Sequence, residues 1–175
     1  MSDPAVTPAP EAANDAVSEP ELFHGFVLSR NFDQKVLHVP REELVKLVRS
    51  MREQGWLQLI DITGVDYLAH RRSDLPDGIA PERFEVVVNL ISHRDRDRMR
   101  IRVQVPESDP TVPSLYEIFP GCEASEREVF DMFGITFEGH PDLTRILMPE
   151  DWDGYPLRKD YGIGRIPVQF KDSHT

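Results

Sequence analysis

Between residues 41 and 55, apolar side chains recur at the spacing of an α-helix. The opposite face of this segment is charged, and Gly55 follows it as a helix stop. The pattern predicts a surface helix that lies with one face on a sheet. Its apolar positions are Leu44, Val45, Leu47, Val48 and Met51.

Three later segments are typical of β-strands. Residues 56–68 are rich in Ile and Leu and predict a short strand that ends near Gly64, whereas residues 83–92 are rich in β-branched side chains. Residues 99–105 alternate strictly between apolar and polar side chains. Because the charged link 93–97 joins the last two segments, they are expected to form an antiparallel hairpin with one face in solvent.

A second, short helix is predicted from Glu126 to Phe133. Ser125 and Glu128 stand in the S-x-x-E order of a capping box, which satisfies the free amides at a helix start. Gly134 stands where a left-handed C-terminal cap is expected.

The pattern divides the chain into three parts. Residues 1–20 combine four prolines with Ala and acidic residues, so this lead is expected to be disordered. Residues 21–141 are expected to form one core domain. From 142 to 175 the sequence has no period of 2 or 3.6, and we expect an extended C-terminal arm that is ordered by contacts with the core and with other proteins.

Charge and composition exclude several functions. A formal net charge of -11 disfavours nucleic acid and anionic lipid as partners, because both attract clustered Lys and Arg. No run approaches the roughly 18 apolar residues of a membrane span, and the first 20 residues do not resemble a secretory signal. With Cys122 as the single cysteine, this chain alone cannot build a disulfide or a cysteine-based metal site. A single cysteine is consistent with a reducing, cytoplasmic compartment for this chain.

The sharpest catalytic hypothesis is a metal site made of Glu128, Asp131 and His140. Carboxylates three residues apart share one side of a helix, and a nearby His would complete a facial triad, as in a metal hydrolase. The competing interpretation, which we favour, pairs Arg127 with Asp131 and uses Glu128 in the helix cap. The six histidines also lack the H-E-x-x-H spacing of zinc hydrolases.

Other catalytic motifs are weak or absent. Cys122 precedes the predicted helix, where a thiolate is stabilised, yet a lone cysteine beside a turn is more often an ordinary buried residue. The sequence contains no G-x-S-x-G, no G-x-x-x-x-G-K-[ST] and no G-x-G-x-x-G. No nucleotide or flavin site is therefore expected.

What remains is a charged and aromatic stretch from residue 125 to residue 161, which we call the signature segment. Its Arg, Asp and Glu residues alternate with large apolar residues and are flanked by Pro and Gly. That composition is typical of an interface core with a polar rim. From physical chemistry alone it favours an obligate subunit over a free-standing enzyme.

The signature segment resembles the 30-kilodalton-type subunit, also called the C subunit, of respiratory complex I, the proton-pumping NADH:quinone oxidoreductase. The resemblance rests on EREVFDMFGI at residues 126–135 and on GHPDLTRIL and GYPLRKDY further on. A weaker likeness extends back to about Phe23. The resemblance implies an α+β fold with a mainly antiparallel sheet, helices packed on one face, and the extended arm.

The resemblance also implies a role. The subunit is expected to be cofactor-free and non-catalytic, to support the quinone module in the peripheral arm of the complex, and to lie at the cytoplasmic face of the cell membrane. NADH, FMN, iron-sulfur clusters and quinone would be held by partners, of which the 49-kilodalton-type quinone-pocket subunit and the small iron-sulfur subunit would be neighbours. An alternative is the homologous subunit of a ferredoxin- or F420-linked dehydrogenase or of a membrane-bound hydrogenase.

Carried onto this sequence, the resemblance assigns no catalytic, cofactor or metal residue. It makes the matching positions of the signature segment structural or subunit-contact residues. These are Glu126, Arg127, Glu128, Asp131, Phe133, Gly134, His140, Pro141, Arg145, Trp152, Pro156, Leu157, Arg158, Lys159, Asp160 and Tyr161.

Overall fold

A computed structural model of the chain describes residues 21–32, 34–70 and 75–162. The predicted disordered lead and the last thirteen residues of the predicted arm lie outside these ranges. The helices are α1 Leu44–Glu53 and α2 Glu123–Phe133, each preceded by a 3-10 turn, Arg41–Glu43 and Pro120–Cys122. The strands are β1 Leu22–Phe23, β2 Phe26–Asn31, β3 Gln34–His38, β4 Gln58–Asp66, β5 Phe84–Ser92, β6 Asp97–Val105, β7 Thr111–Pro113 and β8 Thr136–Glu138.

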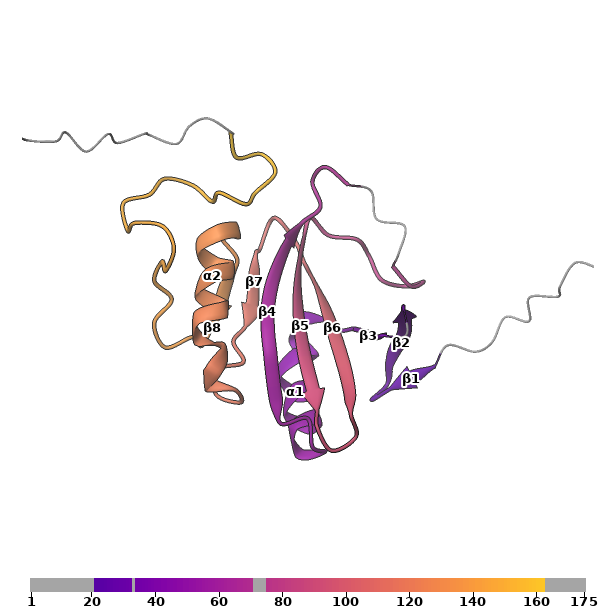
Figure 1. Ribbon diagram of the computed structural model, residues 1–175. Coiled ribbons are helices and arrows are strands. Elements are labelled where there is room, and N and C mark those ends of the chain that lie inside the picture. Colours follow the sequence, from indigo (N-terminus) through magenta and orange to yellow (C-terminus); the bar gives the residue numbers. More distant parts are fainter. Residues whose placement is uncertain (1–20, 33, 71–74, 163–175) are drawn as a thin grey trace, which may run out of the picture.

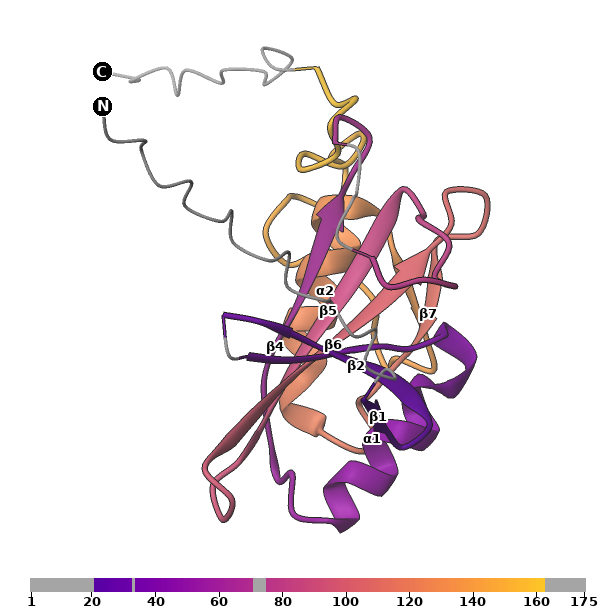
Figure 2. The same ribbon diagram turned by 90° about the vertical axis from the view of Figure 1, so that its right-hand side faces the viewer.

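A six-stranded sheet in the order β1-β2-β3-β6-β5-β4 is the centre of the fold (Figure 1). All its neighbours are antiparallel except β3 and β6, and β7 and β8 form a separate parallel pair. Figure 2 shows the twist of this sheet, with β2 and β3 crossing β5 and β6 at a steep angle. The predicted α+β class with a mainly antiparallel sheet is confirmed.

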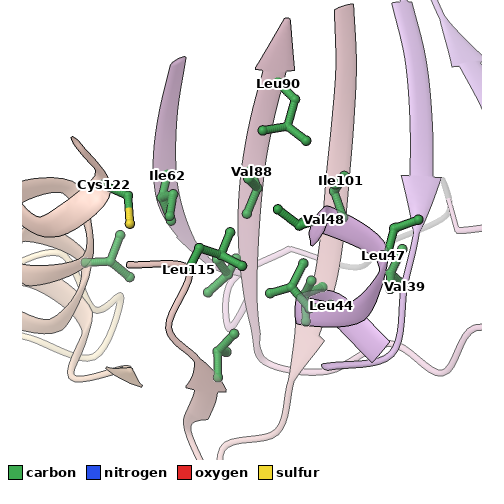
Figure 3. Close-up of a cluster of buried hydrophobic side chains, with 14 of the residues drawn as sticks. Val39, Leu44, Leu47, Val48, Ile62, Val88, Leu90, Ile101, Leu115 and Cys122 are labelled. Carbon is green, nitrogen blue, oxygen red and sulfur yellow. The ribbon is translucent and has the colours of Figure 1, made fainter. Parts of the chain in front are cut away.

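The β5–β6 hairpin forms as predicted, but the expectation that its second face lies in solvent is wrong, because Glu85 and Val87 are buried on that face and Arg102 is half-buried. Its register places Val88 opposite Ile101, and the apolar residues that share their face of the two strands are buried on the side where α1 lies. Figure 3 shows Leu44 and Val48 of α1 directed at this side of the sheet. Val48 is completely buried, so the predicted amphipathic helix and its orientation are confirmed.

Helix α2 covers the same face of the sheet near its β4 edge. Gly64 lies opposite Val86 of β5, so it faces this layer, and a Cβ atom at Gly64 would lie only 2.7 Å from the ring of Phe133. Strand β4 therefore continues past Gly64 to Asp66, beyond the predicted end. Glycine is used here to let the helix approach the strand, and it does not terminate the strand.

The start of α2 differs from the prediction. The helix begins at Glu123, and its N-cap, Cys122, makes no side-chain cap hydrogen bond. The predicted capping box of Ser125 and Glu128 is therefore wrong, because the preceding 3-10 turn runs directly into the helix and places both residues inside it. The C-terminal cap is confirmed, since Gly134 has a φ of 70° and its N–H donates to Phe130 O.

Candidate subunit interface

Asp131 holds the C-terminal arm against the last turn of α2. Its side chain is fully buried, and Oδ2 accepts the backbone N–H groups of Ile146, Leu147 and Met148 at 3.0, 2.7 and 2.8 Å. Oδ1 accepts a 2.6 Å bond from the Arg145 guanidinium. Burial would raise the pKa of Asp131, but the Met148 N–H and Arg145 outweigh it and hold the pKa below its usual range.

Arg145 connects that carboxylate to the next part of the arm. Its Nη1 also donates to Asp131 O at 3.1 Å, while Nη2 donates to Trp152 O and Gly154 O at 3.1 and 3.0 Å. The guanidinium lies 5.3 Å from the ring centre of Tyr155. One arginine therefore closes residues 145–154 into a loop on the end of the helix.

A second arginine fixes the arm where it passes the helix end. Arg158 Nε donates to Phe133 O at 2.6 Å, and its guanidinium lies between the rings of Phe84 and Tyr155, 5.0 and 4.6 Å from their centres. A Cβ atom at Gly134 would lie 2.5 Å from Tyr155. Glycine is thus required at this position both by its positive φ and by the space that the arm occupies.

Strand β4 supplies another buried carboxylate that binds the arm. Asp66 Oδ2 accepts the Lys159 N–H at 2.8 Å, although the two residues are 93 positions apart, and it pairs with Arg83 at 3.1 Å. Arg83 in turn pairs with Asp160 at 2.8 Å and with Glu107. Burial would raise the pKa of Asp66, but the bonds from Arg83 and Lys159 lower it.

Arg127 binds the first part of the arm to the outer side of α2. It donates to Thr144 O and Oγ1 at 3.1 and 3.0 Å and to Arg145 O at 3.1 Å. Its ion pair is with Glu123, at 3.1 Å. The predicted pair of Arg127 with Asp131 is wrong, because Asp131 lies on the buried side of the helix.

Glu126 organises the segment before α2. Its buried carboxylate accepts hydrogen bonds from Ser114 Oγ at 2.6 Å, from Leu115 N–H at 2.7 Å and from the Cys122 thiol at 3.3 Å. Burial, together with the Glu126 carboxylate, raises the pKa of the Cys122 thiol far above its ordinary value. The thiolate that a nucleophile needs is therefore disfavoured at Cys122.

The three residues of the metal hypothesis do not converge. Asp131 is occupied by the arm, and His140 accepts the Asp142 N–H on Nδ1 while its Nε2 lies 3.2 Å from Glu123 O. Glu128 is exposed. Within the described ranges, no group of three or more His, Cys, Asp or Glu side chains is placed to hold a metal ion.

The remaining predicted residues divide by exposure. Phe133 is buried on Gly64, and Trp152, Pro156 and Tyr161 are half-buried. Those exposed to solvent are Glu128, Pro141, Leu157, Lys159 and Asp160. The structure thus places the buried charges of the signature segment in bonds within the chain, and leaves a smaller set of its predicted residues exposed to solvent.

Two residues of this arrangement, Asp66 and Arg83, have no signal in the sequence. Each is a single charge at a strand end, and their partners Lys159 and Asp160 are far along the chain. A charge at the end of a β-strand is common, so no local pattern distinguishes these two.

The fold and these bonds agree with a family match. Residues 37–166 match the model of the family described as respiratory-chain NADH dehydrogenase, 30 Kd subunit. The chain belongs to this family. The match spans Asp66, Asp131 and the described part of the arm that they bind, so the predicted resemblance is confirmed.

Curated relatives of the family are similar in sequence over most of this chain. The C subunit of the NADH-quinone oxidoreductase of Roseiflexus castenholzii is 47% identical over 137 residues, which cover 77% of this chain and 73% of that protein. The corresponding protein of Thermus thermophilus, named subunit 5, is 44% identical over 77% of this chain and 64% of its own length. The C subunit of Saccharopolyspora erythraea is 43% identical over 77% and 51%. The chain therefore spans about half to three quarters of these relatives.

Solved structures share the fold. A trypsin-resistant fragment of Nqo5 is 37% identical, with a TM-score of 0.61 over 68% of this chain and 90% of the fragment. A chain of the archaeal membrane-bound sulfane sulfur reductase superposes with a TM-score of 0.64 over 86% of this chain and 91% of that chain, at 22% identity. In the described ranges, neither helix is long and apolar enough to cross a membrane.

Proposed function

We propose that this chain is a cofactor-free structural subunit in the peripheral arm of a proton-translocating NADH:quinone oxidoreductase. It supports the quinone module, with the 49-kilodalton-type quinone-pocket subunit and the small iron-sulfur subunit as neighbours, at the cytoplasmic face of the cell membrane. NADH, FMN, iron-sulfur clusters and quinone are held by these and other partners. The sequence identity of 40–47% to subunits of NADH-quinone oxidoreductases supports this assignment.

The observation that carries the proposal is the bonding of Asp131. A buried carboxylate that accepts three consecutive backbone N–H groups and an arginine gives the arm one fixed shape, although the arm has no helix or strand in its described part. Such an arm buries little of its own surface, so its fixed shape is of use chiefly to a partner that binds it. The charged residues that suggested a catalytic site hold the arm in its shape.

The alternative assignment is the homologous subunit of a complex with another electron donor. This alternative stays open because a chain of a sulfane sulfur reductase complex has the same fold. The fold alone therefore does not determine the electron donor. The partners would decide between the two.

The test is purification of the complex that contains the tagged full chain from detergent-solubilised membranes of its host. We expect a quinone-pocket subunit and a small iron-sulfur subunit to co-purify with the chain, together with NADH:quinone reductase activity. Recovery with hydrogenase subunits or without NADH oxidation would support the alternative. Recovery of the chain free of any partner, or with a stoichiometric metal of its own, would overturn the structural-subunit proposal.

A further inference from the structure

The bonds of Asp131 also determine which side chains of the arm face solvent. Because the N–H groups of residues 146–148 all point at one carboxylate oxygen, the backbone turns inward and two side chains are left outside. Ile146 is 41% exposed and Leu147 is 56% exposed, whereas Met148 packs against the core.

A third apolar side chain is held at the same helix end. The Leu157 N–H donates to Met132 O at 3.1 Å, next to Asp131 in α2, and the Leu157 side chain is 48% exposed. Single exposed apolar residues are ordinary on protein surfaces. Here three of them project from two segments that are bonded to one helical turn, so their arrangement is fixed before any partner binds.

The surface around these residues carries more acidic than basic side chains, since Lys159 is the one exposed cation among residues 142–162. Glu150, Asp151 and Asp153 are exposed in the loop that Arg145 closes, and none of them forms an ion pair within the described ranges. Arg145 and Arg158 do not balance these charges at the surface, because their guanidinium groups are turned inward onto Asp131 and onto Phe133 O. The outer side of the arm thus combines apolar side chains with carboxylates that form no ion pair with another described residue.

We infer that Ile146, Leu147 and Leu157 are the apolar contacts by which the arm binds its partner, on a partner surface that has apolar recesses bordered by Lys and Arg. This inference rests on the proposed function and assigns separate roles within the signature segment. The buried charges hold the arm in shape, and the exposed apolar side chains bind. The carboxylates steer the encounter with a basic surface.

The experiment compares tagged full-length variants in the host and measures the quinone-pocket subunit that co-purifies per chain. The double variant I146S/L147S and the variant L157S are matched with L57S, which changes a leucine that is 69% exposed just before β4, outside the arm. We expect the arm variants to retain about ten-fold less partner. Thermal unfolding of each isolated chain should match wild type, since none of these side chains packs in the core.

Three results would overturn the inference. In one, I146S/L147S and L157S retain as much partner as wild type. In another, L57S loses as much partner as they do. In the third, the isolated wild-type chain is a dimer that I146S/L147S dissociates, because the occupant would then be a second copy. If wild type itself retains no quinone-pocket subunit, the proposed function fails first, and the inference fails with it.

The charge part of the inference has its own experiment. The variant E150Q/D151N/D153N should bind the partner more weakly at low salt, by about ten-fold, and should lose much of the salt dependence seen with wild type. Equal or tighter binding by this variant would show that the partner surface is not basic.

Discussion

Asp131 Oδ1 accepts a 2.6 Å hydrogen bond from the Arg145 guanidinium, and both side chains are largely buried. Fourteen positions separate the two residues, and β8 lies between them. The bond therefore makes the end of α2 and the beginning of the arm one structural unit. In Figure 1 the orange chain after β8 runs along α2 and then passes its C-terminal end.

Replacement of Asp131 by Asn should release the arm. Asn keeps the shape of the side chain but loses the charge and one acceptor oxygen, so Arg145 and some of the three N–H groups lose their partner. We expect unfolding to become easier by about 3 kcal/mol and the arm to become sensitive to protease. Urea titration and limited proteolysis measure these effects. The matched control is E128Q, on the exposed side of the same helix, which should change neither; an equally protected arm in D131N would contradict the assignment.

Two of the buried carboxylates, Asp66 and Asp131, make stability depend on pH. Asp66 and Asp131 both have a pKa that folding lowers, so their contribution is complete above the unfolded value of about 3.9 and is lost as pH falls through the folded value. The urea midpoint of the full chain should therefore begin to fall below about pH 5 and should fall most steeply below about pH 3.9, as the pH approaches the lowered pKa values of the folded state. D66N/D131N should show a shallower fall. An identical slope in wild type and variant would mean that Asp66 and Asp131 do not cause the pH dependence of stability.

Replacement of Gly64 by Ala tests the approach of α2 to the sheet. The new methyl group would lie 2.7 Å from the Phe133 ring, so the helix has to move away, at an expected cost of about 1–3 kcal/mol. G121A is the control, because a Cβ atom there meets nothing within 4 Å. Thermal or urea unfolding measures both variants. A neutral G64A would show that α2 packs less closely than the structure describes.

Trp152 has one buried polar group that lowers the stability of the fold, and a substitution can remove this group. Its indole Nε1 is buried and has no hydrogen-bond acceptor within the described ranges. W152F keeps most of the ring but removes this donor, so the free energy of unfolding should stay the same or increase by about 1 kcal/mol. Urea titration followed by circular dichroism measures it. A loss of about 2 kcal/mol or more, which is the size of the penalty for leaving a partner unsatisfied, would reveal an acceptor for this N–H.

Much of the fold follows from local pattern. Strict alternation in residues 99–105 and the apolar face of residues 44–51 were sufficient to predict β6 and α1, because burial of one face sets the period of each element. Strands β2 and β3 were not predicted. β2 reads FVLSRN and β3 is only five residues long, so they carry little alternation, and the pairing of β3 with β6 is set by the tertiary fold.

The sequence predicts which residues of the signature segment belong to the site, but not the hydrogen bonds and ion pairs that they form. The sequence places Asp131, Arg145 and Arg158 in one segment, and the resemblance assigns them a structural or contact role. It does not show that Asp131 faces inward or that Asp66 on β4 binds Lys159, since these bonds join residues far apart in the sequence. The failed capping box has a similar origin, because a four-residue pattern cannot reveal the 3-10 turn that starts the helix earlier.

The central claim is that the buried charges of the signature segment support assembly and take no part in electron transfer. The most direct measurement compares R145A with R98A, which removes an exposed arginine on β6. Both the amount of assembled complex in membranes and the NADH:quinone turnover per complex are measured. The account predicts that R145A lowers the amount of complex several-fold while turnover per complex stays within about two-fold of wild type. Normal assembly with collapsed turnover in R145A would contradict it.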